Sequence, residues 1–83
     1  MKEKDLFGIL LGRKIRYKRE YLGLSRYTIA EQADLSENYL GLIERGHKIP
    51  GSYTLYRLSK VLCMSEQQLF NEIETDLKKV KKS

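Results

Sequence analysis

Residues 26–45 read RYTIAEQADLSENYLGLIER, and this stretch decides the fold. Its pattern predicts a short helix over residues 26–33, a sharp turn at Asp34-Leu35 and a second helix over residues 37–45. Two short helices that cross steeply need inward apolar residues, a small residue where the backbones approach, and a buried residue in the turn. The residues that meet these needs are Ile29, Ala30, Ala33, Leu35, Leu40 and Ile43.

Helix signals continue on both sides of this helix pair. Residues 5–22 carry apolar side chains at helical spacing and end before Gly23, a residue that suits a left-handed helix terminus. Two further helices are predicted over residues 53–62 and 66–73, and no window alternates strongly enough to predict a strand. The chain is therefore predicted to be all-α, with five helices. The serines predicted to cap helix N-termini are Ser25, Ser36, Ser52 and Ser65.

Charge is unevenly distributed along the 83 residues, whose formal net charge is +5. Residues 1–33 contain eight Lys and Arg against four Asp and Glu, a net of +4. Residues 34–77 contain four against seven, a net of −3, and four lysines follow them. A basic half beside an acidic segment predicts oriented binding to a polyanion such as nucleic acid.

Composition also limits the class of protein. A chain of 83 residues predicts a single domain over residues 1–83. The longest apolar stretch, residues 6–11, is too short for a membrane span of about 20 residues. One cysteine and one histidine exclude an internal disulfide and a zinc site. There is no signal peptide, nucleophile–base pair or phosphate-binding glycine loop, so we expect a cytoplasmic protein that is not an enzyme and needs no cofactor.

Four short motifs carry a resemblance to a known family. They are Gly23-Leu24-Ser25, Ile29-Ala30, Leu35-Ser36 and Ile43-Glu44-Arg45-Gly46. Together they resemble the helix-turn-helix domain of phage Cro and repressor proteins and of the bacterial regulators built like them. The resemblance covers residues 11–70, with the motif at residues 26–45, and it implies a five-helix, lambda-repressor-like domain. It also implies a homodimer that binds double-stranded DNA at a palindromic operator.

The chain departs from the family pattern at three positions. Arg26 stands where such domains often have glutamine, and Asp34 and Cys63 stand where they favour glycine. Aspartate tolerates a left-handed backbone better than most residues, so the turn at Asp34 is expected to survive. Cys63 is expected to be a small apolar residue at the end of its helix.

The resemblance places DNA reading on the helix over residues 37–45. Asn38, near the start of this helix, could pair with adenine, and Leu42 could contact thymine methyl groups. Glu37 could accept from cytosine, or it could only stabilise the helix N-terminus through the dipole. For each of these residues the alternative is a solvated or packed surface position. The full predicted DNA-binding set is Arg26, Tyr27, Ser36, Glu37, Asn38, Tyr39, Leu42, Arg45, His47 and Lys48.

Structural roles are expected for two other sets of residues. The resemblance implies an ion pair between Arg19 and Glu44 that joins the first helix to the third. Leu69, Phe70 and Ile73 form an apolar edge on an acidic helix, and such an edge suits a dimer interface.

The two ends of the chain are less specific. The apolar segment of residues 6–11 could extend the dimer interface or could simply cover the core. The basic tail, residues 77–83, is expected to be frayed and to add non-specific attraction to DNA.

Two functions remain open from the sequence. The first is a sequence-specific DNA-binding transcriptional regulator, a dimeric repressor or autoregulator. The alternative is a protein-interaction module of the same fold that does not read an operator. The few polar side chains on the helix over residues 37–45 favour the alternative, whereas the basic residues around that helix favour DNA binding.

Overall fold

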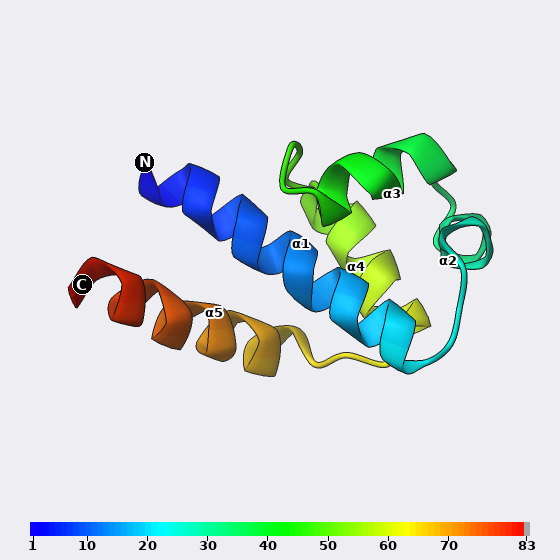
Figure 1. Ribbon diagram of the computed structural model, residues 1–83. Coiled ribbons are helices and arrows are strands. Elements are labelled where there is room, and N and C mark those ends of the chain that lie inside the picture. The colour runs from blue at the N-terminus through cyan, green and yellow to red at the C-terminus, as the bar shows by residue number, and fades with distance from the viewer. Residues whose placement is uncertain (83) are drawn as a thin grey trace.

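The chain folds into five α-helices (Figure 1). The computed structural model describes residues 1–82, and the side chains of residues 1–80. No strand occurs within residues 1–82, and the all-α prediction is confirmed. Helix α1 lies between α3 and α5, so its two sides serve two different contacts. The helices are α1 (Glu3–Tyr21), α2 (Arg26–Gln32), α3 (Glu37–Glu44), α4 (Ser52–Val61) and α5 (Glu66–Lys82).

Serine hydroxyls cap three of the helices, as predicted. The Oγ atoms of Ser25, Ser36 and Ser65 accept from the backbone N–H three residues further on, at 3.1, 3.0 and 3.3 Å. Each bond satisfies one of the N–H groups that a helix leaves unpaired in its first turn. Ser52 does not act in this way, because it is the first residue of α4 and the N-cap is Gly51. The prediction of a Ser52 cap is therefore wrong.

Four helices end in one backbone motif. The second residue after each helix has a positive φ, which is 72° at Gly23, 60° at Asp34, 79° at Gly46 and 56° at Cys63. The following N–H then donates to the carbonyl five residues earlier, at 2.8 to 3.1 Å, as in the Schellman motif. Asp34 thus keeps the predicted turn. The Cys63 side chain is exposed, so the expectation that it packs as a small apolar residue is wrong.

One apolar core joins the five helices. Leu69 and Ile73 belong to it, with 3% and 1% of their surface exposed. Both side chains are covered by the chain itself, so the prediction that they face a dimer partner is corrected. Of that predicted set only Phe70 is exposed, and its ring lies 6.2 Å from the ring of Phe7. The largest fully buried side chains are Leu11, Ile15, Ile29, Leu40, Ile43, Leu58, Leu62 and Ile73.

The apolar segment of residues 6–11 mostly covers the core. Leu11 is fully buried, and Phe7 and Leu10 pack against the core from its edge. Leu6 is half-buried. Little of this segment is therefore left as a free apolar patch.

Helix α5 is longer than predicted. It continues to Lys82, well beyond the predicted end at Ile73. Leu77 packs against the core and Asp76 pairs with Lys14 of α1, and both contacts hold the additional turns in place. The predicted tail is therefore helical through Lys82, and Ser83 lies outside the described residues. None of the helices within the described chain is both long and apolar enough to cross a membrane.

Gly12 sets the distance between α1 and α3. A methyl group at Gly12 would meet the carbonyl oxygen of Ile43 and, at 2.8 Å, that of Glu44. Backbone atoms in a helix cannot move aside independently, so a side chain here would push α1 away from α3. The contact therefore requires glycine.

We expect Gly12→Ala to lower the free energy of unfolding by about 1–3 kcal/mol, because the new methyl group overpacks a backbone contact. Gly41→Ala is the matched control on α3. There a methyl group would meet only the end of the flexible Arg45 side chain, at 3.0 Å. This control should be neutral or stabilising by up to about 1 kcal/mol, since alanine favours a helix more than glycine does. Urea unfolding followed by circular dichroism measures both changes, and equal stability of the two variants would contradict the close approach at Gly12.

Candidate nucleic-acid interface

Glu44, at the C-terminal end of α3, is a buried carboxylate that joins α3 to α1. Only 1% of its side chain is exposed. Arg19 of α1 donates from Nε to Oε2 at 2.6 Å and from Nη2 to Oε1 at 3.1 Å. Arg19 Nη1 also donates to the carbonyl of Leu24, at 2.9 Å. Arg19 and Glu44 therefore form the ion pair that the family resemblance implies, with bidentate geometry.

Arg26, the first residue of α2, binds the same carboxylate. Its Nε donates to Oε1 of Glu44 at 3.0 Å, and 38% of its side chain is exposed. The sequence placed Arg26 only in the DNA-binding set. The structure instead gives it a structural bond on one edge of the guanidinium, while the rest of the group faces solvent.

The electrostatics of this cluster follow from its burial and its hydrogen bonds. Burial alone raises the pKa of Glu44, but the hydrogen bonds from Arg19 and Arg26 and the positive charges of these two residues together lower that pKa by more, so it lies below its ordinary value. The hydrogen bond to Glu44 raises the pKa of Arg19, against a smaller opposite effect of burial. Glu44 therefore remains ionised and holds both arginines at neutral pH.

The N-terminal half of α3 carries the exposed part of the predicted reading surface. Ser36, Glu37 and Asn38 are exposed, and the Ser36 hydroxyl is the N-cap. Leu42 is half-buried, so one part of its side chain faces solvent. Tyr39 packs partly against the core, which leaves its edge available at the surface.

The C-terminal half of α3 is shaped by Arg45. The guanidinium of Arg45 folds back over Gly41, because a methyl group at Gly41 would lie 3.0 Å from its Nη1. Gly41 is consequently buried and not an open position on the outer face. The basic group of Arg45 therefore lies on the same surface of α3 that carries Asn38 and Leu42.

The loop after α3 brings further basic residues to this side of the molecule. His47 and Lys48 are exposed, and together with Lys4 of α1 they line a shallow groove of about 240 Å³. Lys4 is absent from the set predicted by sequence, because nothing in the linear pattern places the first turn of α1 beside this loop. Tyr27, at the start of α2, is exposed as well.

Comparison with protein families decides what this arrangement is. The sequence model of the helix-turn-helix family matches residues 15–69, which include α2, α3 and the Arg19–Glu44 pair. The chain belongs to this helix-turn-helix family. Its type is that of the Cro and phage repressor proteins, which are DNA-binding transcription regulators.

Solved helix-turn-helix regulators share the architecture of this chain. The restriction-modification controller protein C.AhdI from Aeromonas hydrophila is 27% identical, with a TM-score of 0.71 over 75% of this chain and 94% of that one. Two structures of the clp gene regulator ClgR from Corynebacterium glutamicum are 27% identical, with TM-scores of 0.79 and 0.76. The first match covers 86% of this chain and 76% of the ClgR chain, and the second covers 84% of this chain and 91% of the ClgR chain. No curated protein sequence matches. The family and these neighbours are regulators, not enzymes.

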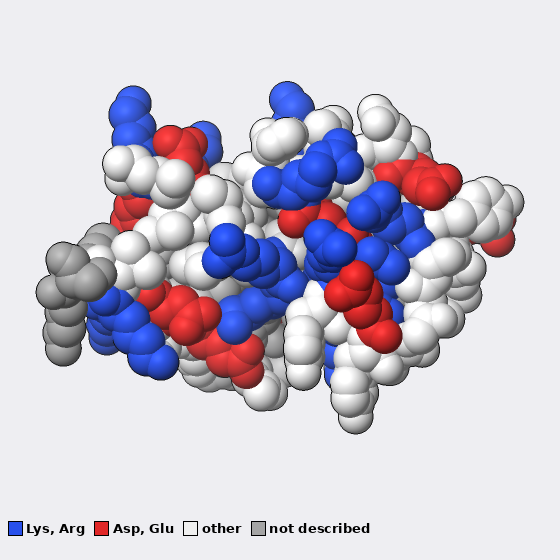
Figure 2. All heavy atoms as spheres, viewed as in Figure 1, with Lys and Arg blue, Asp and Glu red and all other residues white. Residues whose placement is uncertain are grey.

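Surface charge in this member of the family favours a polyanion on one side. Lys and Arg side chains gather in the middle of the face shown in Figure 2, over α1, and several acidic side chains lie along α5. Glu44 is covered by its two arginines, so it presents little negative charge to this face.

We expect Arg19→Ala and Glu44→Ala each to lower the free energy of unfolding by about 3–5 kcal/mol. Glu44→Ala leaves the buried Arg19 without its carboxylate, and Arg19→Ala leaves the buried Glu44 with only the partly exposed Arg26. The double variant should be less destabilised than the sum of the two single losses. Thermal and urea unfolding measure this double-mutant cycle, and additive losses would mean that the two side chains do not interact.

A second arm of the cycle tests the shared carboxylate. Arg26→Ala should also lower stability, by about 1 kcal/mol, because its bond to Glu44 is partly solvent-exposed. Arg16→Ala is the matched control, since Arg16 pairs with Glu20 at 3.2 Å on the open surface of α1. An Arg26→Ala variant that is no less stable than Arg16→Ala would contradict the proposed three-residue cluster.

Proposed function

We propose that this cytoplasmic protein is a homodimeric regulator that binds a palindromic operator in double-stranded DNA and acts as a repressor or autoregulator. The observation that carries the proposal is the exposed N-terminal half of α3, held rigidly on α1 and α2 by the buried Glu44 cluster. A helix fixed in this way enters the major groove without a further ordering cost. Control of transcription also agrees with the regulatory roles in the names of C.AhdI and ClgR.

Base reading is assigned to Asn38, Leu42 and Glu37. The Asn38 side-chain amide can donate to N7 of adenine and accept from its N6 amino group. The exposed part of Leu42 can contact a thymine methyl group. Glu37 either accepts from cytosine N4 or stabilises the first turn of α3. Arg45 lies over Gly41 within the same surface, so it can reach a guanine or a phosphate.

Phosphate binding is assigned to side chains that surround α3. Lys48, His47 and Lys4 come from the groove beside the loop after α3, and Arg26 offers the exposed edge of its guanidinium. The hydroxyl groups of Tyr27 and Tyr39 can donate hydrogen bonds to phosphate oxygens. The Ser36 hydroxyl lies at the N-terminus of α3. These contacts fix the register of the protein on the duplex and carry no sequence information directly.

The dimer contact is assigned to the exposed ring of Phe70 on α5, beside Phe7 of α1. In a two-fold symmetric dimer both subunits contribute the same surface, so the interface contains Phe70 from each of them. Leu69 and Ile73 support the patch from below as core residues. Leu6 is a half-buried neighbour in sequence of Phe7 and can enlarge the contact.

The proposal is tested by selecting bound duplexes from a random pool. We expect a palindromic sequence to be enriched, and Asn38→Ala should then cost about 1–3 kcal/mol on that sequence and little on random DNA. Lys48→Ala and Lys4→Ala should weaken binding to all duplexes and reduce the salt slope by about one for each lost phosphate contact.

Lys60→Ala is the matched control, because it removes the same charge from α4, where Lys60 lies beside Tyr56 and outside every set assigned to DNA. It should leave the salt slope almost unchanged. If no sequence is enriched, or if Asn38→Ala and Leu42→Ala leave the ratio of specific to random binding unchanged, α3 does not read DNA. The protein-interaction module would then be the better interpretation.

We expect Phe70→Asp to convert the dimer into monomers without unfolding the chain, because Phe70 is exposed and not part of the core. Asn71→Asp adds the same charge at the next, exposed position of α5 and should leave the dimer intact. Analytical ultracentrifugation measures the change. A Phe70→Asp variant that remains dimeric would move the interface to another surface.

A further inference from the structure

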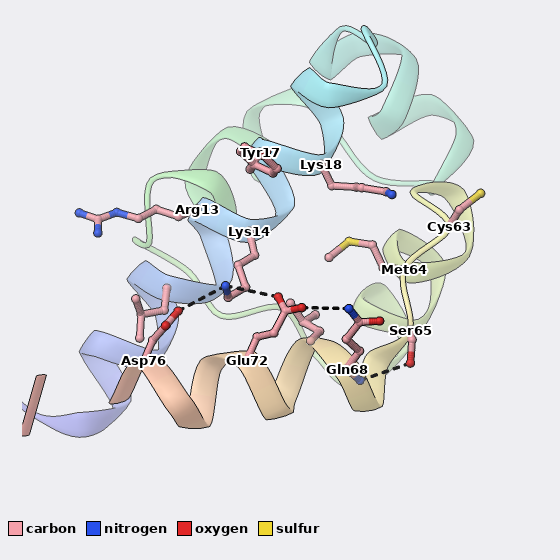
Figure 3. A pocket seen from close by; sticks show the side chains of 12 residues that line it. Arg13, Lys14, Tyr17, Lys18, Cys63, Met64, Ser65, Gln68, Glu72 and Asp76 are labelled. Carbon is pink, nitrogen blue, oxygen red and sulfur yellow. Dashed lines mark hydrogen bonds and ion pairs between the residues drawn. The ribbon is translucent and has the colours of Figure 1, made fainter. Parts of the chain in front are cut away.

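A groove of about 660 Å³ lies between α1 and the beginning of α5 (Figure 3). It is on the side of α1 that faces α5, whereas α3 packs on the opposite side (Figure 1). None of the residues assigned to DNA binding lines it, and Phe70 and Phe7 of the dimer patch do not line it either. Leu69, which supports that patch from the core, is shared with the groove. Its volume is within the range of about 300–1,000 Å³ that is typical of small-molecule sites.

The base of the groove is apolar. Leu10 of α1, Met64 before α5 and Leu69 of α5 line it, and Figure 3 shows the Met64 side chain pointing into the space between the two helices. Leu69 is buried and the other two are half-buried. Methionine adapts its shape readily, so this base can accept a flat or an aliphatic group.

The acidic groups of the groove are paired within it. Lys14 Nζ lies 3.4 Å from Oε1 of Glu72 and 3.3 Å from Oδ2 of Asp76. The second oxygen of Glu72 accepts from Nε2 of Gln68 at 3.0 Å. These bonds form the chain of dashed contacts in Figure 3. Lys14 balances one of the two carboxylates, and with Arg13 and Lys18 the lining of the groove keeps a net charge of +1.

Two basic side chains of the groove have no carboxylate partner among the described residues. They are Arg13 and Lys18, which lie on α1 on either side of Lys14. Lys18 Nζ is 5.4 Å from the centre of the Tyr21 ring, a contact that leaves its three N–H donors free for an anion. Tyr17, between them, adds a hydroxyl group without a partner in the described chain.

We propose that the groove binds a small organic anion with an apolar body, such as an aromatic or aliphatic carboxylate, sulfonate or phosphate ester. The apolar body would cover Leu10, Met64 and Leu69, and the anionic group would pair with Arg13 or Lys18. An inorganic anion would leave the apolar base exposed, and a neutral molecule would leave the two cations unused.

The ligand would link α1 to α5, because its two parts contact side chains of both helices and of the segment before α5. A molecule that binds only the folded state stabilises it, by an amount that rises with ligand concentration over Kd. Since α3 lies on the other side of α1, the ligand and DNA can be bound together. An effect of the ligand on dimerisation would rest on the proposed function, whereas binding itself does not.

Anilinonaphthalene sulfonate is a suitable probe, because it joins an aromatic body to one anionic group. We expect its titration into the full chain, without DNA, to shift the amide resonances of residues around Leu10, Lys18 and Met64 in ¹H–¹⁵N spectra. Resonances of α3 should move little. Shifts scattered over the whole surface would overturn the proposal.

Charge variants identify the cations. Arg13→Gln and Lys18→Gln together should weaken probe binding by at least about tenfold, because a charge-assisted hydrogen bond is lost. Arg16→Gln and Lys60→Gln together are the matched control, since they remove the same two charges outside the groove, and they should change Kd by less than about twofold. Equal weakening by the control would mean that the probe responds only to net charge.

The uncharged analogue phenylnaphthylamine tests the need for an anion. It should bind at least about tenfold more weakly than the sulfonate and should not respond to Arg13→Gln and Lys18→Gln. Equal affinity of the two probes would overturn the anion specificity. Circular dichroism of each variant confirms that the fold is retained, and the operator selection described above is independent of all these outcomes.

Discussion

The carboxylate of Glu44 is the interaction on which the other parts of the structure depend. It accepts from Arg19 at 2.6 and 3.1 Å and from Arg26 at 3.0 Å, and so one buried group ties α1, α2 and α3 together. Desolvation of such a group is expensive, and only the full set of hydrogen bonds offsets it. At Gly12, α1 also approaches the backbone of Glu44 closely. The position of α3 on α1 therefore depends on one backbone contact and one charge cluster.

Local signals in the sequence predicted the elements well. Serine caps and left-handed termini are short-range features, so Ser25, Ser36, Gly23 and Asp34 could be placed from neighbouring residues alone. The N-cap of α4 was predicted one residue too late, at Ser52. Gly51 takes this position with an extended backbone, and glycine has no side chain that could signal a cap in the sequence. The family resemblance added the Arg19–Glu44 pair, which spacing alone does not give.

Features that depend on tertiary contacts were missed. The extension of α5 relies on the packing of Leu77, and the burial of Leu69 and Ile73 depends on how α5 lies against α1, so their apolar edge was interpreted as a dimer surface. The sequence placed Arg26 at the surface, in the DNA-binding set. Its bond to Glu44 could not be predicted, because it depends on how α2 packs on α3. The groove with Arg13 and Lys18 likewise exists only between two packed helices.

In the proposed homodimer, recognition of an operator divides into two separate physical tasks. The identity of the bases is read by α3, whose orientation within one subunit is fixed by Glu44 and Gly12. The distance between half-sites is set by how the two subunits meet, which the proposal assigns to Phe70 on α5. Among the described helices, α1 alone packs closely on both α3 and α5. A change at the α1–α5 contact, including a ligand in the groove, would therefore alter the spacing of the two reading helices without altering the bases that each of them prefers.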